Sequence, residues 1–183
     1  MSLAPSIMRL DRASFRARRD ELVSVYARAY RGLERYAYRH RPEQVGYLEW
    51  LYRGDPEGFL VAEVDRRAVG FASCHGDWLG WPDRVVAELH EIVVEPEAQG
   101  QGVGRLLLQA VFDYARARGR DVLGLWVGEG NRRARHWYRR VGFEEEGKVG
   151  KWVRMTARVP ATAPAGPGRP GRSRPPGRDA TPG

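Results

Sequence analysis

The sequence predicts one domain that mixes α-helices and β-strands around a single sheet. Two observations support this fold class. The 183 residues are 42% hydrophobic and 30% charged, which suits one soluble globular domain. Segments with helical periodicity also alternate with short apolar segments that are bounded by Gly, Pro and Asp, as is typical of strands.

The first third of the chain is expected to be mainly helical. After a short strand at residues 8–10, an apolar face with helical spacing predicts a helix from Ala13. This face consists of Phe15, Leu22, Val23, Tyr26 and Tyr30. A second helix is expected over residues 42–52, and the turn sequence GDPEG follows at 54–58.

The middle of the chain predicts a hairpin and a third strand. Residues 59–64 and 69–76 flank the polar connection 65–68. Residues 77–83 (DWLGWPD) are expected to form a loop, and residues 84–94 (RVVAELHEIVV) the next strand.

The C-terminal part predicts two helices with strands between and after them. An amphipathic helix begins near Val103, a strand covers residues 122–127, and a helix covers residues 131–141. Residues 143–147 and 148–156 are expected to close the sheet as two strands.

The composition changes at Pro160. Residues 160–183 are rich in Pro and Gly and contain no large apolar residue, so they cannot bury enough surface to offset their ordering entropy. We therefore expect a domain over residues 1–159 and a disordered tail over residues 160–183. Two alternatives stay open for the tail: its arginines make a weak contact with nucleic acid or a membrane, or the tail has no role.

The charge distribution argues against nucleic acid as the main ligand. The formal net charge is +8, but residues 43–104 carry four basic and twelve acidic groups, and residues 105–159 thirteen basic and six acidic ones. The basic residues are scattered and interrupted by an acidic segment, unlike the surface of a protein that binds nucleic acid.

No apolar run approaches the ~20 residues of a membrane span. One cysteine, Cys74, excludes an internal disulfide, and this fits a cytoplasmic protein.

Three glycines stand where a well-formed helix begins. Gly100, Gly102 and Gly104 alternate there, although glycine costs about 1 kcal/mol in a helix relative to alanine. The first N–H groups of a helix lack partners within it and lie at the positive end of its dipole, so small residues there open a site for an anion. A phosphate cradle and a flexible turn are the two readings that the glycines alone leave open.

The motif around these glycines distinguishes between phosphate loops. Gly104 is followed by Arg105 rather than the Lys of a Walker A loop, and Leu107 stands where a dinucleotide fingerprint needs glycine. Gln99, Gly102 and Gly104 instead match Gln/Arg-x-x-Gly-x-Gly/Ala. This segment resembles the acetyl-CoA pyrophosphate loop of the GNAT family of N-acetyltransferases.

The resemblance extends over residues 7–155 and is strongest over residues 86–143. LHEIVVEPEAQGQGVGRLLL is similar to that family's fourth strand, loop and third helix, and LWVGEGNRRARHWYRRVGF to its fifth strand and fourth helix. It implies the acyl-CoA N-acyltransferase fold, with a central, mostly antiparallel sheet flanked by helices, and acetyl-CoA as the cosubstrate.

The resemblance also implies which residues bind acetyl-CoA. Residues 92–94 resemble the strand segment whose backbone pairs with the pantetheine arm. Asn131 resembles a pantetheine contact at the start of the fourth helix, although a plain helix N-cap suits Asn equally. The expected cofactor-binding residues are Ile92, Val93, Val94, Gln99, Gly100, Gln101, Gly102, Val103, Gly104, Arg105 and Asn131.

Acyl transfer needs a neutral amine, so a base is useful. Strand alternation predicts that four side chains share one face: Glu88, His90, Ile92 and Val94. Glu88 and His90 are the candidate bases, because the resembled family often places a base on this strand. Glu88 is favoured, since a carboxylate also attracts a cationic acceptor. Glu91 is expected to point to the opposite face. A polar pair without a catalytic role stays open.

Tyr138 resembles the family's general acid, which protonates the departing CoA thiolate. It also lies in one apolar stripe with Ala134, Trp137 and Val141, so a packing role stays open.

One departure from the family's pattern concerns the acceptor. Ribosomal-protein N-terminal acetylases of the family carry a glutamate in the fifth strand where Trp126 stands here, and this argues against protein N-terminal acetylation.

These observations predict an enzyme that transfers acetyl directly from acetyl-CoA to a primary amine, with a cationic small molecule as the acceptor. The acidic balance of residues 43–104 favours such an acceptor. A protein or peptide N-acetyltransferase, a non-catalytic acyl-CoA sensor and a basic interaction module are the alternatives. A homodimer stays open, and no membrane partner is expected.

The remaining cysteine, histidine and aromatic side chains offer further candidates for the site. Cys74 and His75 are strand neighbours and should face opposite sides, which argues against a nucleophilic pair. No metal is expected, because the four histidines lack the spacing of metal ligands. The candidates for an aromatic acceptor pocket are Tyr36, Tyr38, Trp78 and Trp81.

Overall fold

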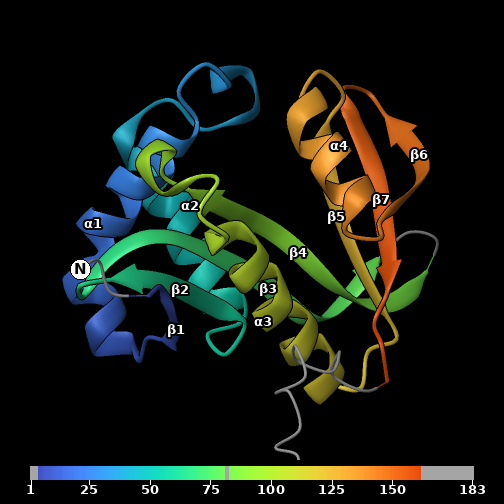
Figure 1. Cartoon of the computed structure of the whole chain (residues 1–183), viewed down its shortest axis with the longest axis horizontal. Coiled ribbons are helices and arrows are strands. Elements are labelled where there is room, and N and C mark those ends of the chain that lie inside the picture. Colours follow the sequence, from blue (N-terminus) through green and yellow to red (C-terminus); the bar gives the residue numbers. More distant parts are fainter. Residues whose placement is uncertain (1–3, 81–82, 162–183) are drawn as a thin grey trace, which may run out of the picture.

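The computed structural model describes residues 4–80 and 83–161. Within these residues, seven strands form one sheet in the order β1-β2-β3-β4-β5-β7-β6 (Figure 1). Neighbouring strands are antiparallel except β4 and β5, which are parallel. The predicted mixed fold with a mostly antiparallel sheet is therefore confirmed. The predicted disordered tail lies, from residue 162 on, outside the described residues.

The strands largely follow the apolar segments of the sequence. They are β1 (Ser6–Arg9), β2 (Phe59–Val64), β3 (Arg67–Gly80), β4 (Arg84–Val94), β5 (Val122–Gly128), β6 (Glu144–Val149) and β7 (Trp152–Arg158). The prediction of a loop over residues 77–83 is wrong for residues 77–80, because β3 continues to Gly80. Trp78 pairs with Val86 and Leu79 with Val85, and such cross-strand pairs of aromatic and branched side chains extend the hairpin.

In the part of the chain that the structure describes, four α-helices flank the sheet. They are α1 (Arg12–Ala29), α2 (Arg41–Gly54), α3 (Val103–Ala117) and α4 (Arg132–Arg140), with short 3₁₀-helices η1 (Glu34–Tyr36) and η2 (Pro96–Ala98). Two of the starts are capped by side chains: the Asp11 carboxylate accepts the N–H of Ser14, and the Asn131 side chain accepts that of Ala134. No helix in the described parts of the chain is long and apolar enough to cross a bilayer.

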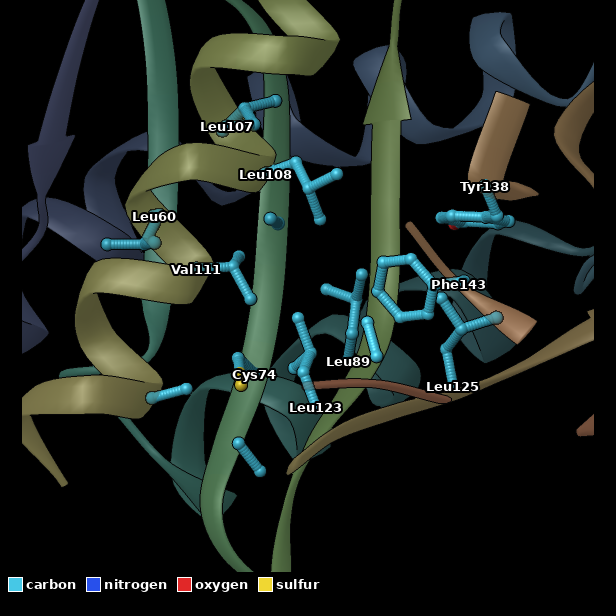
Figure 2. Packing of buried hydrophobic residues seen from close by; sticks show 14 of the residues in the cluster. Leu60, Cys74, Leu89, Leu107, Leu108, Val111, Leu123, Leu125, Tyr138 and Phe143 are labelled. Atoms are coloured by element: carbon cyan, nitrogen blue, oxygen red, sulfur yellow. The ribbon is translucent and has the colours of Figure 1, made fainter. Parts of the chain in front are cut away.

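Two apolar cores lie on opposite faces of the sheet. Figure 2 shows Leu107 and Val111 of α3 pointing toward the sheet, with Tyr138 of α4 beside Phe143 in the same cluster. The other face packs against α1 and α2 through residues such as Leu22 and Leu48. This division follows from alternation along the strands, as for Leu60 and Val61 in β2, which belong to different cores.

The sheet opens at its centre, between β4 and β5. These two strands pair only where Ala87–Leu89 lies beside Leu123–Leu125. Beyond that point β4 runs on toward η2 and the start of α3, whereas β5 runs toward α4 (Figure 1). The backbone of residues 90–94 therefore lacks a strand neighbour on its β5 side, and the site described next lies at this opening.

Candidate active site

A β-bulge at His90 reorients the second half of β4. Ser73 pairs with Glu91 and Cys74 with Leu89, so β4 has one more residue than β3 at this point. The prediction that Glu88, His90, Ile92 and Val94 share one face is therefore wrong. Ile92 and Val94 pack on the α3 side of the sheet.

Glu91 was predicted to point to the face opposite the candidate bases Glu88 and His90. In the structure it lies with both of them on the α1 side of the sheet. Its carboxylate is buried and accepts a hydrogen bond from the hydroxyl of Tyr30, the residue that follows α1, at 2.9 Å. Burial raises the pKa of Glu91 to about 7, although hydrogen bonds from Tyr30 and Tyr47 act in the opposite direction. A carboxylate that titrates near neutral pH is suited to accept a proton from an amine.

Glu88 is engaged in the sheet. Its carboxylate is 2.5 and 2.7 Å from Nη1 of Arg154 on β7, and both side chains are 2% exposed. Gly124 of β5 leaves the space for this ion pair, since a Cβ at that position would collide with the guanidinium. Glu88 lines neither of the two cavities described below.

His90 lies in a cluster of rings. Its imidazole is 4.2 Å from that of His75, and 4.5 and 5.0 Å from the rings of Trp78 and Trp50, measured between ring centroids. Burial, together with the nearby His75 and Arg154, lowers the pKa of His90 to about 3. His90 is therefore neutral at pH 7 and a weaker proton acceptor than Glu91.

The first cavity, which we call the aromatic cavity, has a volume of about 460 Å³. Glu91 and His90 line it together with many aromatic side chains. These are Tyr26, Tyr30, Tyr36, Tyr38, Tyr47, Trp126, Tyr138 and Trp152. The expected Tyr36 and Tyr38 are thus present in its wall. Trp78 does not line it, and Trp81 lies outside the described residues.

The segment between α1 and α2 forms part of this wall by reaching β5 and β7. The Tyr36 hydroxyl accepts the N–H of Gly130 at 2.9 Å, and its ring packs so closely on Gly128 that a Cβ there would collide with it. Nζ of Lys151, in the turn before β7, donates to the carbonyl of Arg35 at 2.7 Å. These contacts join the two sides of the opening.

The second cavity, which we call the glycine-loop cavity, has a volume of about 780 Å³ and lies at the start of α3. Gly100 and Gly102 have φ of +77° and +85°, in the left-handed region that favours glycine. A Cβ at either would meet no atom within 4 Å and would project into open space. Cationic and imidazole side chains line this cavity: Arg31, Arg105, Arg133, His136 and Arg140. The loop therefore offers exposed N–H groups and positive charge to a phosphate.

The predicted cofactor-binding residues differ in whether their side chains reach the glycine-loop cavity. Gln99, Gly100, Gly102, Gly104 and Arg105 line the glycine-loop cavity. The side chains of Val93 and Val103 are instead buried in the two cores, so these positions can contribute only their backbone. Gln101 points its amide to the carbonyl of Glu97, and Gln99 to that of Val94.

Five predicted positions connect the two cavities. The residues Ile92, Val94, Gln99, Asn131 and Tyr138 line both, so the cavities meet at the opening between β4 and β5. Asn131 acts as the helix N-cap that its residue type suggested. Burial, with the Glu91 charge, raises the pKa of Tyr138, so its hydroxyl keeps its proton at neutral pH.

Sequence reasoning missed most of the aromatic cavity. Glu91 comes from β4, Tyr30 from the end of α1 and Tyr47 from α2, and these residues carry no common motif. One local signal was present: Gly128 and Gly130 stand two residues apart at the end of a strand, which indicates close approach of another group. The structure shows that this group is Tyr36.

Comparisons with known proteins agree with this geometry. The model of the acetyltransferase (GNAT) family matches residues 19–143. An uncharacterised N-acetyltransferase of Methanocaldococcus jannaschii is 40% identical over 141 residues, which cover 76% of this chain and 62% of that protein. A mycothiol acetyltransferase of Beutenbergia cavernae is 38% identical over 96 residues, which cover 52% of this chain and 28% of that protein.

The fold is also found among solved structures. The crystal structure of PH1933 from Pyrococcus horikoshii superposes with a TM-score of 0.76 at 38% identity, and the match covers 85% of this chain and 98% of that one. With the family model matching well over half of its residues, the chain belongs to the GNAT family of acetyltransferases.

Proposed function

We propose that this protein transfers the acetyl group of acetyl-CoA directly to the primary amine of a small molecule, which enters the aromatic cavity as an ammonium ion. The observation that carries this proposal is the position of Glu91. A buried carboxylate with a pKa of about 7 lines an aromatic cavity where that cavity meets the glycine-loop cavity.

The glycine-loop cavity fits the anionic part of acetyl-CoA. The pyrophosphate would lie against the N–H groups at the start of α3, with Gly100 and Gly102 keeping that space free of side chains. The backbone of residues 90–94, which has no strand neighbour on its β5 side, would pair with the amides of the pantetheine arm. This arrangement directs the thioester toward Tyr138, which lines both cavities.

The chemistry follows from the protonation states of two side chains. Bound acetyl-CoA supplies the thioester carbonyl carbon that the amine attacks. The Glu91 carboxylate takes a proton from the ammonium, which makes the nitrogen lone pair available for a new C–N bond. The Tyr138 hydroxyl, protonated at neutral pH, donates a proton to the sulfur as the C–S bond breaks, and the second proton that the nitrogen loses in forming the amide restores this hydroxyl.

Glu91 takes the place of Glu88 in this proposal. Both carboxylates are buried, but Glu88 faces the guanidinium of Arg154, whereas Glu91 is bound by neutral hydroxyls and faces a cavity. An ammonium in the aromatic cavity would also interact favourably with the faces of the tyrosine rings. His90, neutral at pH 7, would contribute to the wall.

The proposal is tested by following thiol release from acetyl-CoA with a panel of amines: amino acids, polyamines, aminoglycosides and peptides with free N-termini. We expect release with small amines and an acetylated product of matching mass. Calorimetric binding of acetyl-CoA without thiol release from any amine would instead indicate a sensor. Activity confined to peptides would support a protein N-acetyltransferase and contradict the small acceptor.

A further inference from the structure

The acidic and the basic side chains that line the aromatic cavity lie in different parts of its wall. Glu91 is buried against Tyr30, whereas Arg35 of η1 and Lys151 of the β6–β7 turn are exposed where these segments meet. We propose that the acceptor carries an anionic group, a carboxylate or a phosphate, in addition to its amine, and that Arg35 and Lys151 bind this group. The inference rests on the proposed acetyl transfer, since it assigns the other end of the same acceptor.

Two cations border this edge of the cavity, both beside the Tyr36 ring. The Arg35 guanidinium and the Lys151 ammonium each lie 5.8 Å from the centre of the Tyr36 ring, and the ammonium lies 5.5 Å from that of Trp152. The Lys151 ammonium donates one hydrogen bond, to the carbonyl of Arg35, and retains further N–H groups for a ligand. Like charges repel each other, and an anion bound by both cations would interact favourably with each of them.

The surrounding residues do not neutralise this pair. Within residues 4–80 and 83–161, neither Arg35 nor Lys151 forms an ion pair with a carboxylate. The adjacent Glu34 points its carboxylate to the N–H of Gly32. Lys148, on the same hairpin as Lys151, is by contrast paired with Glu129 at 2.6 Å. The hairpin thus has one neutralised lysine and one that faces the cavity uncompensated.

This arrangement selects among amines. An acceptor with an ammonium at Glu91 and an anion at Lys151 matches both ends of the cavity. A diamine would place its second ammonium beside Arg35 and Lys151, where repulsion disfavours it. An alkylamine would leave the two cations without a partner. The structure therefore favours amino acids and aminoalkyl phosphates over polyamines.

The test compares matched amines by their kcat/KM in thiol release. Glycine, β-alanine and 4-aminobutyrate are each set against the alkylamine of equal length, with 1,3-diaminopropane as the dication and 2-aminoethyl phosphate as the phosphate. We expect the best amino acid or phosphate to exceed its alkylamine by roughly tenfold, as suits a charge-assisted contact at a solvent-exposed edge. The ratio should fall as ionic strength rises from about 0.05 M to about 0.5 M, because salt screens exposed charges.

Variants assign the preference to the two cations. Lys151→Gln and Arg35→Gln should each reduce the ratio severalfold, Lys151→Arg should retain it, and Lys148→Gln should leave it as in the wild type. An alkylamine or diamine that equals the amino acids in the wild type overturns the proposal. So does a ratio that stays the same in both Lys151→Gln and Arg35→Gln.

A binding measurement separates this inference from the proposed function. With CoA present, N-acetyl-β-alanine should bind more tightly than N-propylacetamide in calorimetry, and Lys151→Gln should remove the difference. If no amine gives thiol release but this preference is observed, the acetyl transfer is wrong and the anion site stands. If amines react but the two amides bind equally, the anion site is wrong and the acetyl transfer stands.

Discussion

The glycine-loop cavity and the aromatic cavity differ in how the chain builds them. The wall of the glycine-loop cavity that suits a phosphate is one continuous stretch, from the end of β4 through Gly100 and Gly102 into α3, and α4 with the end of α1 completes the lining. The aromatic cavity is assembled from α1, η1, α2, β4, β5, α4 and β7. The first can be recognised by its spacing of glycines, whereas the second exists only after distant segments have packed together.

This difference explains why one kind of ligand could be predicted more fully than the other. A phosphate interacts with backbone N–H groups and helix dipoles, so its site can be encoded by a few small residues in sequence. An amine acceptor interacts with side chains such as Glu91 and Tyr30, whose properties depend on their neighbours. Mutations in the two cavities should therefore have separable effects.

The largest effect is expected for Glu91→Gln. The amide cannot accept the ammonium proton, so turnover should fall by roughly 10²-fold or more. Acetyl-CoA affinity should stay close to that of the wild type, since Glu91 does not line the glycine-loop cavity. The acidic limb of the pH–rate profile, expected near pH 7 in the wild type, should be lost. A fully active Glu91→Gln beside an inactive, folded Glu88→Gln would return the role of the base to Glu88.

A second prediction concerns stability. The pKa of Glu91 is about 7 in the folded state, against a reference value of 4.5. As pH rises from 4.5 to 7, the unfolded state releases this proton first, so the contribution of Glu91 to stability decreases and is lowest above pH 7. The shift corresponds to about 3 kcal/mol. Glu91→Gln should therefore be more stable than the wild type at pH 8, with the difference vanishing toward pH 4.5 in denaturant unfolding.

Glu95 provides the matched control of opposite sign. Burial raises its pKa, but hydrogen bonds from Arg67 and Arg28 outweigh burial and lower it overall. Its ion pairs therefore stabilise the fold above pH 4.5, and this stabilisation is lost as pH falls through the lowered pKa. Glu95→Gln should be less stable than the wild type at pH 8. If the free energy of unfolding depended on pH in the same way for the Glu91 and Glu95 variants, the difference between the two environments would be refuted.

Tyr138→Phe should reduce turnover by roughly tenfold to 10²-fold when chemistry limits the rate. The hydroxyl is assigned to the departing sulfur, while the ring packs against Phe143 and Trp137 and is kept in the variant. Acetyl-CoA affinity and the melting temperature should change little. An unaltered single-turnover rate would show that Tyr138 serves packing alone.

The smallest effect is expected at the glycine loop. Gly102→Val should weaken acetyl-CoA binding by roughly tenfold, about 1.4 kcal/mol, because its side chain would enter the phosphate space and its φ of +85° disfavours valine. Gly119→Val is the matched control, since Gly119 has φ of +71° and an open Cβ direction at the opposite end of α3. Calorimetry should show weaker binding for Gly102→Val alone. Equal losses in both variants would indicate strain in α3 rather than a phosphate contact.

Much of the fold could be predicted because its signals are local. The apolar stripe of α3 and the alternation in β2 specify which faces are buried. The order of elements and the glycine loop then indicated the family. The predicted loop over residues 77–83 failed at residues 77–80 because strand pairing with residues 84–86 extends β3, and no local signal reports the partner.

The sequence by itself determined the helices, the glycine-rich start of α3 and hence the side on which a phosphate can bind, because these depend on neighbours in the chain. The tertiary structure alone decided which carboxylate faces the cavity. The bulge at His90 arises from pairing with β3, and the raised pKa of Glu91 arises from burial beneath α1. Both effects depend on residues far away in sequence, so a regular strand pattern could not reveal them.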